Sequence, residues 1–402
     1  MGNGTSSTST GGNVGATGGA GTGGTPSGGL VVATSDILSA LTDSACVGWS
    51  SELEFSPPLL EFIVDTSGSM AEVAKNSTTS KWAITQSALS NALNRLPESA
   101  GVGLLLFPNM NTVPNHNDSS IPPVVLPVES CVNAAAMVPP APLGSVGSAQ
   151  RAALAQALTN AYVGGGTPTN DALAYAFTMG LTPAGTRFSY LNPSVVIITD
   201  GQPTIQFGCA GTGSAAYPVD WHPLVDTIAS ISYSTPPIPT FIIGTPGSEA
   251  QSFTGADGRP WLSMAARLGG SAQTTGCLDS GPNYCHYDLS PSIDFATDLA
   301  AALGDIVGRA APCSLALPAL PNGLQLAFDH INVLYKQNVV VGTPTVQWLV
   351  GRTLDPTCAA GTSEGWYSSG TANEIVLCPN TCARVHADKY AAVQIVGGCA
   401  PL

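Results

Sequence analysis

The sequence predicts an α/β fold: a doubly wound, mostly parallel open sheet over residues 45–311, followed by a small disulfide-containing β-rich module over 312–402. Up to about residue 311, short apolar runs alternate with segments of helical periodicity, which is typical of parallel strands joined by helices. After Pro312 the pattern changes to short strands separated by turn residues, with five cysteines among them. A chain of 402 residues is long enough for two or three such units.

The expected elements follow from the spacing of apolar residues. In the first domain, apolar runs predict strands at 59–65, 102–107, 195–199 and 240–244, with short edge strands at 124–128 and 284–287. Helical patterns predict helices at 81–96, 149–162, 168–180, 219–231, 261–268 and 290–309. In the last module we expect strands at 324–335, 343–350, 374–377 and 391–396, with no strong helix between them.

The N-terminal residues 1–35 are expected to form a flexible tether. Up to about residue 30 they carry no charge and almost no large apolar side chain, so they cannot bury a core of their own. One interpretation is a spacer that holds the next domain away from a surface. The other is a disordered tail without a role.

Charge and cysteine content limit the class of protein. Only 9% of residues are charged and the net charge is −14, which argues against nucleic-acid binding and favours the attraction of cations. The ten cysteines form no C-x-x-C pair, so disulfides in an oxidising compartment are a better interpretation than a redox or metal cluster. Each of the two units holds an odd number of cysteines, so if every cysteine is paired within the chain, at least one bridge joins the units, and Cys46–Cys313 is our candidate.

The expected location is secreted, periplasmic or tethered at the cell surface. No apolar run is long enough to span a membrane, and no signal peptide is present. We therefore interpret the chain as a mature form to which Met1 has been added.

Three fragments place oxygen-bearing side chains where strands end or a helix begins. Asp65-Thr66-Ser67-Gly68-Ser69 follows the first buried strand, Gly165-Gly166-Thr167 precedes a helix, and Thr199-Asp200-Gly201 ends another strand. In a doubly wound sheet such ends meet at the edge where ligands bind. Carboxylate and hydroxyl oxygens suit Mg²⁺, with Ca²⁺ or Mn²⁺ as alternatives, rather than zinc or copper. The candidate metal site therefore consists of Asp65, Ser67, Ser69, Thr167 and Asp200.

At these residues the sequence resembles the von Willebrand factor A-domain family, whose fold is Rossmann-like. The D-x-S-x-S pattern at 65–69, the threonine at 167 and the T-D-G strand end at 199–201 match the family's metal-ion-dependent adhesion site in the same order. The resemblance covers roughly residues 58–310. It implies that the three hydroxyl side chains contact the metal, that the two aspartates often act through water, and that a Glu or Asp of a ligand completes the shell.

The tether, the cysteines and the tail resemble exported bacterial members of that family. Two long inserts, at 109–147 and 202–220, depart from a minimal A domain. Because such loops would shape the rim of the site, no known ligand of the family is carried over to this chain.

Each site residue also has a local explanation. Asp65 could be a simple strand-end acid, Ser67 and Ser69 turn or N-cap residues, and Thr167 an N-cap before Pro168. These roles explain the residues singly, but they do not explain why all three fragments fall at one edge of the sheet.

Two further clusters have simpler interpretations than metal binding. A solvated turn accounts for an Asn-rich group better than a second cation site does: Asn109, Asn111, Asn115, Asn117 and Asp118. An edge strand with a disulfide likewise accounts for Cys285-His286 and Asp288.

We expect a binding protein that recognises an exposed Asp or Glu of a protein partner through the divalent cation. The alternative is a self-assembling surface or filament protein whose A domain makes the subunit contacts. An enzyme is the least favoured class, because the sequence has no G-x-S-x-G, H-E-x-x-H or P-loop motif. The last helix, 290–309, leads into Cys313, and a bridge there would hold that helix and make the site rigid.

Overall fold

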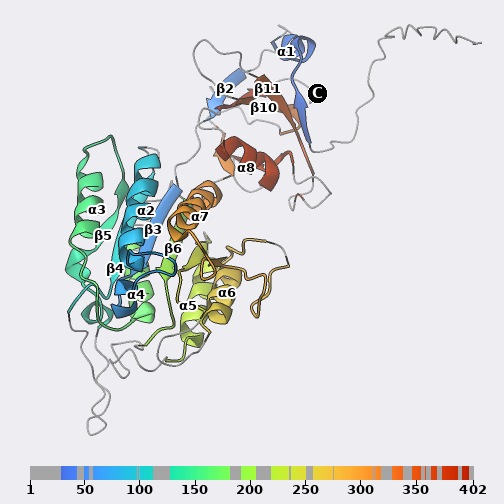
Figure 1. Ribbon diagram of the computed structural model, residues 1–402. Helices are drawn as coiled ribbons and strands as arrows, with labels where there is room; N and C mark the ends of the chain where they lie inside the picture. The colour runs from blue at the N-terminus through green and yellow to red at the C-terminus, as the bar shows by residue number, and fades with distance from the viewer. Residues whose placement is uncertain are drawn as a thin grey trace, which may run out of the picture.

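The structure is a computed structural model of the chain (Figure 1). It describes residues 29–42, 49–53, 58–96, 98, 100–111, 127–181, 192–204, 219–234, 237–249, 257–274, 276–310, 313–317, 328–337, 346–354, 358, 364–368, 374–387 and 392–397. Most of the predicted tether, the Asn-rich group from 112 onward, and Cys46, Cys209 and Cys399 lie outside this part. Among the residues described, no helix is long and apolar enough to cross a membrane.

A six-stranded sheet with the order β5-β4-β3-β6-β7-β8 forms the centre of the larger part of the chain. The strands are β3 (Pro58–Asp65), β4 (Gly101–Phe107), β5 (Val138–Pro142), β6 (Asn192–Thr199), β7 (Thr240–Gly244) and β8 (Tyr287–Asp288). All neighbours are parallel except β5, which pairs antiparallel with β4. The mostly parallel sheet is therefore confirmed. Its antiparallel edge strand is the proline-rich β5. Of the edge strand predicted at 124–128 only residues 127 and 128 are described, and residue 128 begins a 3₁₀ helix.

Helices cover both faces of this sheet, which explains why its strands are apolar on both sides (Figure 1). On one face lie α2 (Lys81–Arg95), α3 (Ala149–Thr159) and α7 (Phe295–Ala310). On the other lie α4 (Thr169–Tyr175), with its extension η4 (Ala176–Leu181), α5 (His222–Ser232) and α6 (Arg259–Leu268). Strand β3 shows the division, because Phe62 packs into the first core and Ile63 into the second.

The remaining strands form two antiparallel sheets, with orders β1-β11-β10-β14-β2 and β12-β13-β9. Their bounds are β1 (Gly29–Val32), β2 (Trp49–Leu53), β9 (Ser314–Ala316), β10 (Ile331–Gln337), β11 (Val346–Gly351), β12 (Trp366–Ser368), β13 (Glu374–Leu377) and β14 (Ala392–Gly397). Side chains from both sheets, such as Tyr335 and Ile375, share one core. The β-rich character of the module is confirmed.

The module also contains a helix that the sequence did not lead us to expect, α8 (Pro379–Ala387). Only a few of its side chains, among them Cys382 and Val385, reach the core. That is too few to produce a clear helical periodicity in nine residues.

The boundaries of the two units differ from those expected from sequence. Residues 29–32 form β1, which pairs with β11, and residues 49–53 form β2, which pairs with β14. Helix α1 (Ser35–Thr42) buries Leu41 in a cluster with residues of β10, β11 and β14. The segment 29–53 is therefore part of the β module, and the α/β domain is inserted between β2 and β9. A sequence pattern does not reveal this, because it identifies a strand but not a partner some 300 residues away.

Three disulfides are present among the described residues: Cys277–Cys285, Cys313–Cys382 and Cys358–Cys378. The proposed Cys46–Cys313 bridge is therefore wrong, since Cys313 pairs with Cys382 inside the β module. Cys46 and Cys313 were paired because they flank the α/β domain in sequence, whereas the pairing of β9 with β13 places Cys313 beside the start of α8. Helix α7 still ends three residues before a bridged cysteine and contacts α8. The rigidity of the site stays a prediction.

One buried acid in the sheet leads to a testable expectation. Glu61, in the middle of β3, is fully buried, and neither carboxyl oxygen has a hydrogen-bond partner among the described residues. Gly103 makes room for it, since a Cβ there would lie 1.9 Å from Glu61 Oε2. Burial raises the pKa of Glu61 well above its ordinary value.

We expect the stability of the protein to fall as the pH rises above the ordinary glutamate pKa, because the folded state holds the Glu61 proton more tightly than the unfolded state does. In Glu61→Met this loss should disappear, and the free energy of unfolding at pH 8 should rise by about 1–3 kcal/mol. Urea unfolding at pH 5 and pH 8 measures both effects. The exposed Glu98→Met is the control, and an equal gain for Glu61→Met at both pH values would contradict the expectation.

Candidate metal-binding site

The site lies where the direction of the sheet connections reverses. Strands β3 and β6 are parallel neighbours at the centre of the sheet, with Val64 opposite Ile198, so Asp65 and Asp200 leave the same edge side by side. The helix that follows β3 covers one face, and the helices associated with β6 and β7 cover the other. This is the position at which doubly wound sheets bind their ligands.

Asp65 is fully buried and held on both carboxyl oxygens. Its Oδ1 accepts a hydrogen bond from the backbone N–H of Ser67 at 2.7 Å, and its Oδ2 accepts one from the Thr199 hydroxyl at 2.6 Å. The first bond closes a tight turn directly after the strand. The chain then continues into the short 3₁₀ helix η1 (Gly68–Ala71). The carboxylate is therefore fixed in one orientation before any ligand arrives.

Backbone hydrogen bonds join the second fragment to the first. The N–H of Gly68 donates to the carbonyl of Gly165 at 3.0 Å, and the N–H of Gly164 donates to the carbonyl of Thr66 at 2.8 Å. Gly165 has a φ of +83°, a conformation that favours glycine. The loop before α4 is thus fastened directly to the D-x-S-x-S turn.

The same loop is fastened to the third fragment. The N–H of Thr167 donates to the Thr204 hydroxyl at 2.8 Å, and the N–H of Thr204 donates to the carbonyl of Thr167 at 3.1 Å. Since Thr204 follows Asp200 by four residues, the three fragments expected to meet are joined at one edge of the sheet. Thr167 itself is buried.

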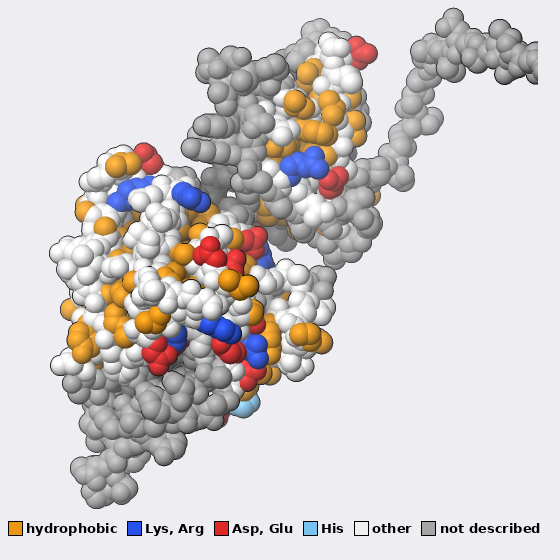
Figure 2. Space-filling model, in the orientation of Figure 1, with side chains coloured by type: hydrophobic (Ala, Val, Ile, Leu, Met, Phe, Trp, Pro, Cys, Tyr) orange, Lys and Arg blue, Asp and Glu red, His pale blue; other side chains and the backbone are white. Residues whose placement is uncertain are grey.

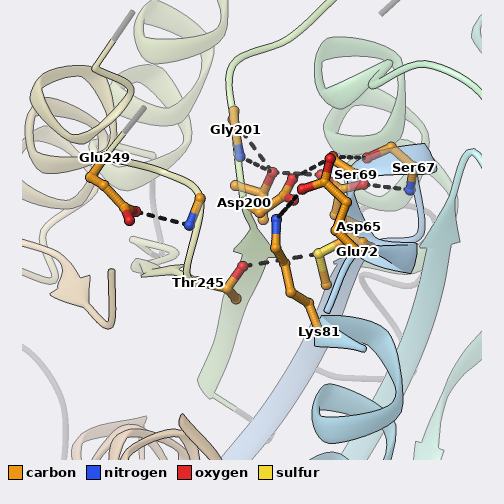
Figure 3. A network of polar contacts seen from close by, with 12 residues as sticks. Asp65, Ser67, Ser69, Glu72, Lys81, Asp200, Gly201, Thr245 and Glu249 are labelled. Atoms are coloured by element: carbon orange, nitrogen blue, oxygen red, sulfur yellow. Dashed lines mark hydrogen bonds and ion pairs between the residues drawn. The ribbon is translucent and has the colours of Figure 1, made fainter. Parts of the chain in front are cut away.

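Hydroxyl groups connect the two aspartates (Figure 3). The Ser69 hydroxyl donates to Asp200 Oδ1 at 2.8 Å and lies 3.2 Å from the Ser67 hydroxyl. Asp200 is nearly as buried as Asp65. All five residues of the predicted site therefore lie in three fragments that contact one another, and four of them form a continuous polar network.

The electrostatics of the network favour a cation. Burial raises the pKa of Asp65 to about 7, and the charge of Asp200 adds to that effect, while the hydrogen bonds from Ser67 and Thr199 oppose it. Two carboxylates in a buried site repel each other, and a cation between them removes the repulsion. A bound cation is therefore expected to stabilise the ionised form of the two carboxylates.

Lys81 is a member of the network that sequence reasoning missed. Its Nζ lies 2.8 Å from Asp200 Oδ2 and 3.1 Å from Glu72 Oε2, and only 6% of its side chain is exposed. Burial would lower the pKa of this lysine, but the charges and hydrogen bonds of Asp200 and Glu72 outweigh burial and raise it. No sequence pattern indicates this role, because Lys81 opens a helix and lysine is mostly an exposed residue.

The donor set fits a hard divalent cation such as Mg²⁺. It consists of two carboxylates and three hydroxyls, all oxygens, and no group of three or more His, Cys, Asp or Glu side chains is placed to hold a metal anywhere in the described ranges. Shortly after Thr167 in the chain, the Thr169 hydroxyl and the side-chain oxygen Oδ1 of Asn170 are buried without a hydrogen-bond partner among the described residues. Buried polar atoms of this kind are rare in folded proteins unless water or a ligand meets them.

Two alternative cation sites are not supported. Cys285 is bridged to Cys277, as expected for an edge segment with a disulfide. Asn109 uses its side-chain oxygen to accept a hydrogen bond from the N–H of Tyr162, and so acts in loop structure. Asn115, Asn117 and Asp118 lie outside the described residues.

The strand order, the insertion of the three loops at the central strand ends and the D-x-S-x-S turn together decide the fold type. The described residues between 58 and 310 have a von Willebrand factor A-like fold. No family model matches the sequence, and no curated protein matches it.

Several solved structures are similar to this A-like chain. A von Willebrand factor type A protein from Catenulispora acidiphila shows 12% identity and a TM-score of 0.37, and the alignment covers 85% of this chain and 57% of that one. The pilus adhesin SpaC from Lactobacillus rhamnosus GG shows 14% identity and a TM-score of 0.41, with 86% and 40% covered. Proximal thread matrix protein 1 from the mussel byssus, with a zinc-occupied MIDAS motif, shows 13% identity and a TM-score of 0.33, with 63% and 50% covered. The chain thus spans about half the length of these proteins.

Proposed function

We propose that the A-like domain binds a divalent cation, with Mg²⁺ as the first candidate, and uses it to hold an acidic group of a protein partner. The observation that carries the proposal is the joining of three separate loops around two buried aspartates by the hydrogen bonds of Gly68, Thr167 and Ser69. No requirement of the fold itself explains why two acids should be buried side by side at a strand edge.

The chain's own residues supply the binding chemistry. Ser67, Ser69 and Thr167 would hold the cation through neutral hydroxyl oxygens, and Asp65 and Asp200 would neutralise its charge directly or through water. A cation held in this way keeps a site at which it can accept a carboxylate oxygen from another molecule. In this proposal the domain acts as a binding module rather than as an enzyme.

The disulfides and the surface fit a protein outside the reducing cytosol. Three bridges lie among the described residues, and disulfides persist in oxidising compartments. Among the described residues on the face shown in Figure 2, charged side chains are few and mixed in sign. The described side chains on that face form no basic patch of the kind that binds nucleic acid.

A binding experiment with two stages tests the proposal. Isothermal titration with Mg²⁺, Ca²⁺ and Mn²⁺ should show a single site in the wild type and a strongly weakened one in Thr167→Ala. Capture of a partner from a surface extract should then require the cation, reverse on addition of EDTA and diminish with free acetate. If none of the three cations binds, the proposal fails. If chelation dissolves an oligomer on gel filtration, the partner is another copy of this chain.

A further inference from the structure

The metal-binding motif does not explain why a buried lysine contacts one of the two aspartates of the candidate site. The Lys81 ammonium contacts Asp200 Oδ2 at 2.8 Å, while the Ser69 hydroxyl donates a hydrogen bond to Asp200 Oδ1 (Figure 3). Both carboxyl oxygens of Asp200 are therefore engaged, one of them by a full positive charge. Within the described network this is the one ammonium group that lies directly on a predicted metal residue.

The position is unfavourable for a lysine on local grounds. Lys81 is the first residue of α2, after the N-cap Ser80, and a positive charge near a helix N-terminus opposes the helix dipole. Its side chain is also removed from water, which disfavours the charged form. A residue that is unfavourable both for its helix and for burial marks a site where another requirement decides its identity.

The surrounding loop is shaped to bring the ammonium to Asp200. The turn between residues 73 and 80 is closed by a bridge between Val73 and Ser80, and the N–H of Lys81 donates to the carbonyl of Glu72 at 2.9 Å. Gly247, with a φ of +110°, leaves space for the ammonium, because a Cβ there would lie 2.7 Å from Lys81 Nζ. Two separate segments thus accommodate this one charge.

The charge count shows what the lysine changes. When both carboxyls are ionised, Asp65 and Asp200 contribute two negative charges and Lys81 one positive charge, so the buried site carries a net charge of −1 instead of −2. Glu72 also faces Lys81, but its side chain is 51% exposed and water screens it. A divalent cation bound here would leave the site with a net charge of +1, where the two aspartates alone would leave it neutral.

We propose that Lys81 is a built-in counter-charge that weakens cation binding and strengthens the binding of an anionic group to the bound cation. This inference rests on the proposed function, since it concerns the charge of the same site. Lys81 acts through Asp200 and through the field of the site, and so it is a positioning and charge-setting residue.

The test compares Lys81→Met with Lys75→Met, which removes the same charge from an exposed position on the neighbouring turn. Titration calorimetry with Mg²⁺ should show about tenfold or greater tightening in Lys81→Met and no change in Lys75→Met. Acetate added to the Mn²⁺-loaded proteins, followed by water-proton relaxation, should bind several-fold more weakly to Lys81→Met. The opposite directions of the two changes separate a charge effect from structural damage, which would weaken both.

The outcomes are distinguishable from failure of the proposed function. If the wild type binds no Mg²⁺ or Mn²⁺, the metal site itself is wrong. If the wild type binds them and Lys81→Met binds with unchanged or lower affinity, the role of Lys81 is overturned. If Lys81→Met does not fold, Lys81→Gln replaces it. If neither neutral variant folds alone, recovery of the fold with Mg²⁺ supports the counter-charge role, and misfolding that Mg²⁺ does not correct contradicts it.

Discussion

Replacement of Asp65 by asparagine is expected to abolish cation binding while leaving the fold intact. Asparagine has nearly the same shape, and its carbonyl oxygen can still accept one of the two hydrogen bonds that Ser67 and Thr199 donate. What it loses is a full negative charge in a buried site. A unit charge pair at about 4 Å and an effective dielectric constant near 20 is worth about 4 kcal/mol, so the affinity for Mg²⁺ should fall by more than about 100-fold.

The measurement is titration calorimetry of Mg²⁺ into wild type and Asp65→Asn, with circular dichroism to confirm the fold. Asp226→Asn is the matched control, because it removes the same charge from an exposed position on α5. The control should bind Mg²⁺ as the wild type does. Retention of wild-type affinity by Asp65→Asn would show that the cation is held elsewhere.

Removal of the N-terminal strands is expected to unfold the β module and to spare the A-like domain. A chain that begins at residue 54 lacks β1, α1 and β2, and so exposes both outer edges of the five-stranded sheet, at β11 and β14. It also removes Leu41 and Ala33 from the cluster that covers Leu334, Leu349 and Val396. Calorimetric melting should therefore lose one transition, while the transition that Mg²⁺ stabilises remains.

A point variant tests the same packing without shortening the chain. Leu41 is 3% exposed, and Leu41→Ala should cost about 2–4 kcal/mol in the free energy of unfolding of the β module. Val31→Ala, at a side chain that is 57% exposed, should change it by less than about 0.5 kcal/mol. A chain that begins at residue 29 keeps both strands and serves as the truncation control. Equal effects of the two point variants would show that α1 does not pack on the sheet in solution.

The sequence by itself was enough to predict the class of the domain and the three fragments that the structure joins at the candidate site. Strand ends can be located from the point at which an apolar run stops, and parallel strands share one carboxyl edge, so Asp65, Thr167 and Asp200 could be brought together without coordinates. These are local signals, since each fragment carries its own turn chemistry and its own apolar strand or helix beside it.

Pairing between distant segments was decided only by the tertiary structure. Residues 29–53 form strands that pair with segments some 300 residues later in the chain. Cys313 likewise pairs with Cys382, 69 residues further on, and not with the cysteine expected from sequence. Apolar patterns specify that a strand has a buried face, but they carry no information about which neighbour covers it.

The contact between Lys81 and Asp200 was likewise decided only by the tertiary structure. Its sequence position is that of an ordinary residue opening a helix, and only the fold places its ammonium against Asp200, 119 residues away. A lysine is recognised as part of a site through burial and through its partner, and both are properties of the packed protein. The sequence thus predicted the residues of the candidate metal site, whereas the tertiary structure decided the net charge of that site, because burial and ion pairing depend on packing.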